Sequence, residues 1–305
     1  MIILDGGLGR ELQRIGAPFG QPEWSAKALF DGPEFVRQAH DSFIAAGADV
    51  ITTNSYAIVP HHIGQDRYDS DANELLQLSA TLARDAAAGA DRPVRIAASI
   101  PPMFGSYVPD AFEPKTGQVM MKQFRTALAP VADIFIGETM GSIAEIRSYL
   151  EVFVDCAADL WVSATLEDAE VTPGVPRLRS GESVADLITS LAGLRLDAML
   201  FNCSQPEVMN DAITVTAEMT KRHATAHGRA APLIGVYANA FPLMTESYEG
   251  SNSTVHELRV DITPERYTRY AMEWRDSGAS IIGGCCGITP THIAHLAANL
   301  RATET

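Results

Sequence analysis

Cysteine is scarce in this chain of 305 residues, which contains only Cys156, Cys203, Cys285 and Cys286. Four thiols are too few for a disulfide scaffold of this length. Long apolar runs are also missing, because no stretch approaches the roughly 20 residues that a membrane-spanning helix needs. The opening MIILDGG has no basic stretch before an apolar core, so we expect no signal peptide. These absences predict a cytoplasmic protein without a membrane partner.

Positive charge is in short supply as well. Lysine and arginine total 23 against 38 aspartate and glutamate residues, a net charge of -15 at pH 7. Nucleic acids and anionic membranes attract basic surfaces, so neither is expected as a partner. A small-molecule ligand is the remaining expectation. With 46% hydrophobic residues, and no linker or low-complexity tract, residues 1–305 are predicted to form one globular domain.

Eight short apolar runs recur along the chain, each continuous rather than alternating, as in strands buried on both faces. They are residues 2–5, 49–54, 94–99, 133–138, 160–166, 197–203, 232–239 and 279–286. Helical segments with start and stop signals lie between them. The clearest span Pro33–Gly47, Asp71–Ala88, Thr263–Gly278 and the stretch from Thr289.

Eight strands alternating with helices over about 300 residues predict a (β/α)₈ TIM barrel. A doubly wound open sheet is the alternative, but no G-x-G-x-x-G follows the first run. Polar residues end many runs, where a barrel keeps its active site. They are Asp5, Asn54, Glu138, Cys203, Asn239, Cys285 and Cys286. Residues 101–118 and 240–262 follow the third and seventh runs, and both are expected to be long loops that overhang this site.

The sequence IIGGCCGITPTHI places Cys285 and Cys286 at the end of the eighth run, and Cys203 ends the sixth. On one barrel rim these three thiols can converge. Three thiolates suit Zn²⁺, and three protein ligands leave a fourth position open for chemistry. Two alternatives remain: buried cysteines that act as small hydrophobic residues, or a redox pair of Cys203 with one of its neighbours. Cys156 precedes the fifth run and is expected in the core.

The block GGCCGITPTHI is similar to the GGCCGTTPEHI signature of the homocysteine S-methyltransferase family. LDGGLGRELQRIG, WSAKALF, GADVITTNSY, GET, FNCS, YANA and DITPERY resemble further family blocks across the whole chain. The resemblance implies a barrel with zinc on Cys203, Cys285 and Cys286, and a substrate thiolate as the fourth ligand. It implies methyl transfer to homocysteine from a sulphonium, quaternary ammonium or methylfolate donor, giving methionine. The chain length resembles members that use S-methylmethionine or a related sulphonium.

The resemblance also implies roles for rim residues. Asp5 and Glu138 would face the substrate ammonium group, although Asp5 could instead cap the turn that follows it. Backbone amides of Gly6 and Gly7 could bind the carboxylate. Asn239 is a further substrate-binding candidate, and with Tyr237 it would either shape the pocket or close the barrel top.

Aromatic faces should bind a methylated cation, because methyl groups block hydrogen bonds but leave the attraction to the ring quadrupole. Trp24 in the WSAK block is the preferred candidate. Tyr56, Phe104 and Tyr107 are further candidates, for which ordinary loop packing is the favoured interpretation. His61 and His62 are expected in a solvated loop.

Two positions depart from the family pattern. Thr139 stands where betaine-using relatives carry tyrosine, which disfavours betaine as the donor, and Phe241 stands where glycine is commoner. The alternative functions are a non-catalytic zinc or redox-sensing barrel, and a thiol methyltransferase with a different acceptor or with betaine as donor.

Overall fold

The computed structural model describes residues 1–227, 230–243 and 257–302, and its eight strands form one parallel sheet. The strands are β1 (Ile2–Ile3), β2 (Val50–Thr52), β3 (Arg95–Ile100), β4 (Ile134–Met140), β5 (Asp159–Ala164), β6 (Ala198–Asn202), β7 (Leu233–Tyr237) and β8 (Ile281–Ile282). Their order is β1-β8-β7-β6-β5-β4-β3-β2. A parallel bridge between Leu4 and Val50 joins the two ends of this order. The predicted (β/α)₈ barrel is therefore confirmed, and the open sheet is wrong.

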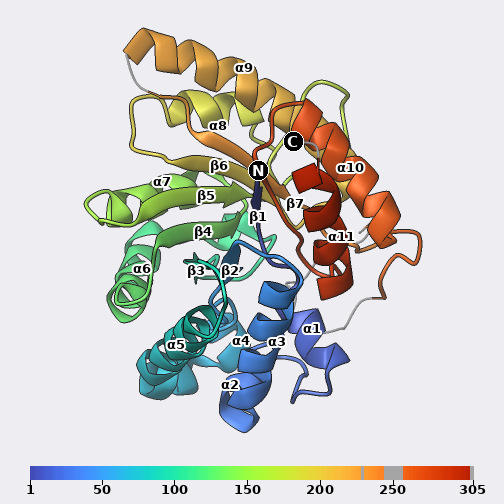
Figure 1. Cartoon of the computed structure of the whole chain (residues 1–305). Coiled ribbons are helices and arrows are strands. Elements are labelled where there is room, and N and C mark those ends of the chain that lie inside the picture. The colour runs from blue at the N-terminus through green and yellow to red at the C-terminus, as the bar shows by residue number, and fades with distance from the viewer. Residues whose placement is uncertain (228–229, 244–256, 303–305) are drawn as a thin grey trace.

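Helices surround the strands on the outside (Figure 1). They are α1 (Leu8–Arg14), α2 (Lys27–Asp31), α3 (Pro33–Ala45), α4 (Pro60–Ile63), α5 (Gln65–Ala88), α6 (Pro114–Leu128), α7 (Ile143–Phe153), α8 (Val184–Ser190), α9 (Met209–His227), α10 (Pro264–Asp276) and α11 (Pro290–Arg301), with 3₁₀ turns η1 (Pro109–Ala111) and η2 (Pro206–Val208). The predicted starts at Pro33, Pro264 and Pro290 are confirmed. Within the described ranges, no helix is both long and apolar enough to cross a membrane.

Two apolar layers explain the continuous hydrophobic runs. Side chains that point into the barrel form one buried cluster, which includes Leu4, Ile136, Trp161 and Leu200. The opposite face of the strands packs against the helices in a second, larger cluster. A strand buried on both faces has no position for a solvated polar residue, so hydrophobic residues follow one another.

Helix α5 begins at Gln65, so the predicted start at Asp71 is wrong. Its first two turns are mostly polar, and among residues 65–70 only Tyr68 is buried. Hydrophobic periodicity therefore could not reveal them. Gly64, at φ 79°, precedes the helix, and the Gln65 side chain donates to Asp69 one turn later at 2.7 Å. Asp71 and Glu74 lie inside the helix, not at a capping box.

The loop after β3 is shorter than predicted. It contains η1, and α6 begins at Pro114, so the connection spans residues 101–113. Glu113 accepts a hydrogen bond from the Thr116 backbone amide at 3.0 Å and fixes this start. Of the predicted 240–262 loop, residues 244–256 lie outside the described residues.

Candidate metal centre and substrate cavity

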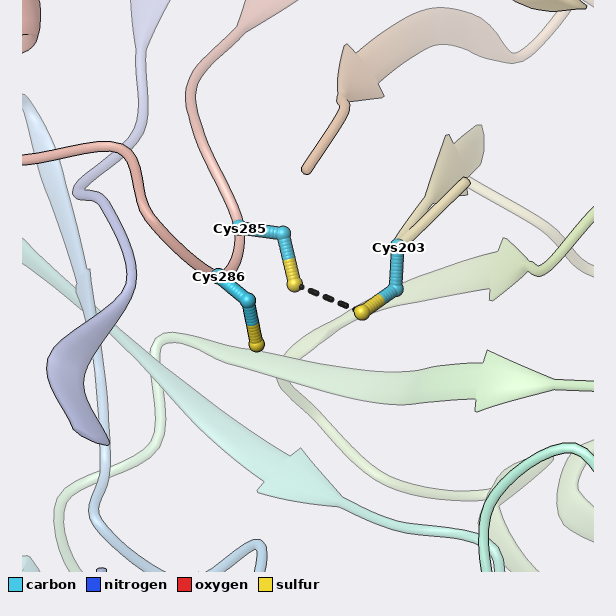
Figure 2. Close-up of side chains that lie close together, drawn as sticks. All are labelled: Cys203, Cys285 and Cys286. Atoms are coloured by element: carbon cyan, nitrogen blue, oxygen red, sulfur yellow. Dashed lines mark hydrogen bonds between the residues drawn. The ribbon is translucent and has the colours of Figure 1, made fainter. Parts of the chain in front are cut away.

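Three cysteine thiols converge at the carboxyl end of the barrel. The Sγ atoms of Cys203, Cys285 and Cys286 all lie within 4.8 Å of one another. Figure 2 shows Cys203 directly after β6 and the other two on the turn after β8, with their sulfur atoms pointing toward one another. The predicted convergence is therefore confirmed. Cys156 lies apart, in the turn after α7, half-buried against the core with its thiol near the carbonyl oxygen of Ala158.

Two glycines, Gly6 and Gly7, allow the turn after β1 to approach the cysteine turn, residues 283–288 after β8, closely. A Cβ atom on Gly7 would lie 2.5 Å from the carbonyl oxygen of Cys285, and one on Gly6 would lie 2.4 Å from that of Ile288. Such distances are well inside van der Waals contact. The Gly7 amide already donates to Ile288 oxygen at 2.9 Å. Gly7 therefore anchors the cysteine turn. Its amide was predicted to bind the substrate carboxylate, but it already has a backbone partner.

Backbone strain gathers at the same place. Outside glycine, four described residues have positive φ: Trp24 at 48°, Tyr107 at 65°, Thr139 at 57° and Cys203 at 53°. All four line one cavity that also contains the cysteine cluster. A non-glycine residue in this region costs of order 1–3 kcal/mol and persists where the surrounding structure holds it. The strain therefore marks this cavity as a functional site.

Hydrogen bonds within the cluster favour charge on one sulfur. The Cys285 thiol donates a hydrogen bond to Cys203 Sγ at 3.0 Å, and the Tyr107 hydroxyl donates to Cys203 Sγ at 2.8 Å. Hydrogen bonds from Cys285, Cys286, Tyr107 and Asn239 lower the pKa of the Cys203 thiol well below its usual value despite burial. The favoured interpretation of Tyr107 as ordinary loop packing is therefore wrong.

Two buried carboxyl groups share the cavity with the thiols. Asp5 Oδ2 accepts from the Thr52 amide at 2.7 Å and from its hydroxyl at 3.0 Å. Burial raises the pKa of Asp5 to about 7, although these two bonds oppose the shift. Asp5 is thus bonded across to β2 and does not cap the turn after β1, which removes the structural alternative.

Glu138 accepts a hydrogen bond from the Ser99 hydroxyl. Burial raises the pKa of Glu138 to about 7 against the effect of this bond, and the nearby charges of Asp5 and Cys203 raise it further. Tyr237 also lines the cavity, and its hydroxyl partly offsets the raised pKa of Glu138. Acidic groups in a buried cavity favour a cationic ligand.

One cation lines the same cavity, where its guanidinium Nη1 donates to Gln13 Oε1 at 2.9 Å. Arg10, on the first turn of α1, is the only basic residue among the described residues that line the cavity. Its guanidinium lies 5.6 Å from the ring centroid of Phe241. A hydrogen bond with Cys203 raises the pKa of the Cys286 thiol well above its usual value, and the charge of Arg10 opposes that shift. Sequence reasoning missed Arg10. The available signal was a basic residue four positions after Gly6 and three after Gly7, in the block that follows the first strand.

The aromatic candidates divide into two groups. Trp24 and Tyr56 line the cavity and contact each other edge to face, with centroids 6.1 Å apart. The Tyr56 hydroxyl lies 2.6 Å from that of Ser106. Phe104 is not among the lining residues and packs on Phe112.

Two further predictions change. His62 is buried on α4, with Nδ1 3.0 Å from Pro22 oxygen and its ring 6.0 Å from Trp24, so a solvated loop is wrong for it. His61 is partly buried and contacts His62 edge to face, with ring centroids 5.2 Å apart. Asn239 is not among the lining residues. Its backbone amide donates to Ser204 oxygen, and its Oδ1 accepts from the Phe241 amide at 3.2 Å. Its side chain also helps to lower the pKa of the Cys203 thiol, so a role in shaping the site stays a prediction.

This geometry defines a class: barrels in which three converging cysteine thiols line a cavity together with acidic and aromatic side chains. A group of three thiols this close can hold a metal ion. The family model described as homocysteine S-methyltransferase matches residues 2–300, and the chain belongs to this family.

Relatives of known name cover nearly the whole chain. Homocysteine S-methyltransferase 3 from Arabidopsis thaliana is 26% identical and covers 97% of this chain and 88% of the relative. Selenocysteine methyltransferase from Astragalus bisulcatus is 27% identical and covers 95% of this chain and 90% of the relative. Among solved structures, the crystal structure of the homocysteine methyltransferase MmuM from Escherichia coli, in its metallated form, is similar to this chain, with 26% sequence identity. It has a TM-score of 0.74 and covers 98% of this chain and 96% of that chain.

Proposed function

We propose that this chain transfers a methyl group from a sulphonium donor, such as S-methylmethionine, to the thiol of homocysteine on a zinc centre. The observation that carries the proposal is the cluster of three thiols within 4.8 Å of one another in a cavity that also holds Asp5 and Glu138. Sulfur ligands suit Zn²⁺, and three of them leave one position open. When bound there by Cys203, Cys285 and Cys286, zinc lowers the pKa of a substrate thiol so that it is a thiolate at neutral pH.

Asp5 and Glu138 would hold the ammonium group of the acceptor. Both carboxyl groups have pKa values raised to about 7 by burial, and a bound cation would favour their ionised form. Arg10 is the partner we propose for the acceptor carboxylate, in place of the Gly7 amide. Opposite charges at two points of the cavity would fix the amino-acid end of the acceptor and aim its sulfur at the cysteines.

Trp24 and Tyr56 would receive the methylated cation. Aromatic faces attract a sulphonium through the ring quadrupole. In the transfer, the acceptor sulfur forms a bond to the methyl carbon, and the carbon–sulphonium bond breaks. The bonding pair returns to the donor sulfur, which leaves as a neutral thioether. No proton has to be supplied to this leaving group, which agrees with a cavity that holds no histidine among its described lining residues.

The test uses homocysteine labelled with carbon-13 at all four carbons and unlabelled S-methylmethionine. Labelled methionine then forms only if the acceptor is methylated, and mass spectrometry separates it from the methionine left by the donor. The expected result is labelled methionine with the sulphonium and little or none with betaine in a parallel reaction. Labelled methionine with betaine alone would overturn the donor assignment.

The similarity to a selenocysteine methyltransferase suggests that a selenol should be tested as an alternative acceptor. Selenohomocysteine and selenocysteine should be offered in parallel with homocysteine. A preference for selenocysteine above homocysteine would replace the acceptor but keep the site chemistry. A zinc-replete protein that methylates none of these would favour the sensor alternative, which leaves the paired acidic groups Asp5 and Glu138 unexplained.

A further inference from the structure

Tyr107 contacts the cysteine cluster from outside the barrel strands. It lies on the 101–113 connection, and its hydroxyl is 2.8 Å from Cys203 Sγ and 3.2 Å from the carbonyl oxygen of Cys203. Its backbone is in the left-handed region at φ 65°. A strained residue keeps such a conformation only where its surroundings hold it. The question is which residues hold Tyr107 in place.

Arg179 lies against the tyrosine ring. Its guanidinium carbon is 5.1 Å from the Tyr107 centroid, a cation–π distance. Arg179 comes from the segment between β5 and α8, far in sequence from both Tyr107 and the cysteines. Its backbone amide donates to Thr165 oxygen at 3.3 Å, at the end of β5. The backbone of Arg179 is thus tied to the barrel rim.

Asp168 fixes the guanidinium from the other side. Arg179 Nη1 and Asp168 Oδ1 are 2.8 Å apart, and their side chains are only 14% and 5% exposed. A buried ion pair seldom adds much stability, because desolvation offsets the attraction between the charges. A pair this buried therefore calls for a role beyond stability.

The same carboxylate reaches the cysteine turn. Asp168 Oδ2 accepts a hydrogen bond from the Gln205 amide at 3.1 Å, two residues after Cys203. Ser204, between them, is also held by this segment, since its hydroxyl accepts from the Leu166 amide at 2.8 Å. Two contacts thus link this ion pair to Cys203. Asp168 holds the backbone turn that follows Cys203. Arg179 lies against the Tyr107 ring, whose hydroxyl donates to Cys203 Sγ.

We propose that Arg179 and Asp168 are positioning residues of the thiol centre, which hold the Tyr107 hydroxyl against Cys203 sulfur and so tune that sulfur as a metal ligand. This inference rests on the proposed function only in taking the cluster as a metal site. A hydrogen bond to a thiolate draws electron density from the sulfur. Groups that orient metal ligands in this way typically change metal affinity or activity by 10–100-fold.

The variants separate the hydroxyl from the stacking group. Tyr107→Phe keeps the ring and removes the hydrogen bond. Arg179→Lys keeps a positive charge for Asp168 but removes the planar group that lies over the ring. The double variant tests whether Arg179 acts through Tyr107. Arg177→Lys is the matched control, because Arg177 lies on the same segment and is bound to Gly181 oxygen at 2.8 Å in an exposed position.

Two readouts do not depend on turnover: zinc affinity by competition with a chromophoric chelator, and the sulfur-to-cobalt charge-transfer band of the Co²⁺-substituted protein. We expect Tyr107→Phe and Arg179→Lys each to weaken zinc binding about 10-fold, because Cys203 loses the group that orients it as a ligand. The band should move to lower energy, because the sulfur becomes more electron-rich. The double variant should match Tyr107→Phe, and Arg177→Lys should match the parent protein.

An unchanged band and affinity in Arg179→Lys, or effects that add in the double variant, would overturn the proposal. Thermal unfolding of each metal-free variant reports whether the fold is retained. A parent protein that binds neither zinc nor cobalt would overturn the metal site itself, and that outcome is distinct from a failure confined to Arg179.

Discussion

Cys285 Sγ lies 3.0 Å from Cys203 Sγ although 82 positions separate the two residues in the sequence. The contact crosses from the turn after β8 to the turn after β6, over β7, which pairs with both strands. The parallel order β6-β7-β8 places the two turns at the same edge of the sheet. The cluster is therefore a product of the fold and requires no local cysteine motif.

Replacing Glu138 should affect the acceptor through its ammonium group. For Glu138→Gln we expect KM for homocysteine to rise roughly 10–100-fold, as for loss of a hydrogen bond to a charged group. KM for 4-mercaptobutanoate, which lacks the amino group, should change little. Glu145→Gln is the control, since Glu145 is also buried with a pKa raised to about 7 by burial but binds the Gly141 amide outside the cavity. An equal effect of Glu138→Gln on both acceptors would contradict this role.

Arg10 should show the opposite selectivity. Arg10→Met removes the cation that lines the cavity and keeps a long apolar side chain against Phe241. We expect KM for homocysteine to rise roughly 10-fold or more, since a charge-assisted bond to its carboxylate is lost. KM for 3-aminopropanethiol, which has no carboxylate, should stay near the parent value. If both acceptors lose affinity alike, Arg10 acts on the thiol centre and not on the carboxylate.

The raised pKa values of Asp5 and Glu138, both about 7, predict an acidic limb in the pH profile. Below pH 7 these carboxyl groups take up protons and can no longer pair with the ammonium group. The value of kcat/KM for homocysteine should therefore fall as the pH drops through 7, since this parameter reports the free enzyme. For 4-mercaptobutanoate the same limb should be much weaker. Parallel profiles for the two acceptors would rule out this assignment.

His40 predicts a separate effect on stability. It is fully buried on α3, and neither ring nitrogen has a hydrogen-bond partner among the described residues. Burial lowers the pKa of His40 to about 4. Between pH 4 and the usual value of about 6.5, the unfolded chain binds a proton that the folded protein does not. The free energy of unfolding should therefore fall as the pH drops through this range, by about 3 kcal/mol from His40.

Urea unfolding of the parent and of His40→Leu between pH 4 and 7 isolates this contribution, because all other titrating groups are shared. We expect the stability of the variant to depend less on pH than that of the parent over this range. Identical slopes would mean that His40 has the same pKa in the folded protein as in the unfolded chain, which would contradict this prediction.

The strands and the cysteine cluster could be predicted from the sequence. Strands buried on both faces give continuous apolar runs, and so all eight were found. The cysteines could be assigned to one rim because Cys203 and the Cys285–Cys286 pair each end such a run. The predicted start of helix α5 was six residues too late, because the first turns of this helix carry little apolar periodicity.

The loop residues could not be placed in advance. Tyr107 reaches Cys203 only because its backbone is left-handed, and Arg179 meets Tyr107 only because two separate rim segments pack together. His62 is buried by Trp24 and Pro22, which lie about 40 residues earlier. Contacts of this kind depend on tertiary structure, and no local pattern of residues encodes them.

The most direct test of the account is titration of the metal-free protein with zinc while methionine formation from homocysteine and S-methylmethionine is followed. The account predicts that activity rises in proportion to added zinc and reaches its plateau at about one zinc per chain. Cys286→Ala should lose both tight zinc binding and turnover, whereas Cys156→Ala, altered outside the cluster, should behave as the parent. Full turnover without zinc, or in Cys286→Ala, would contradict the account.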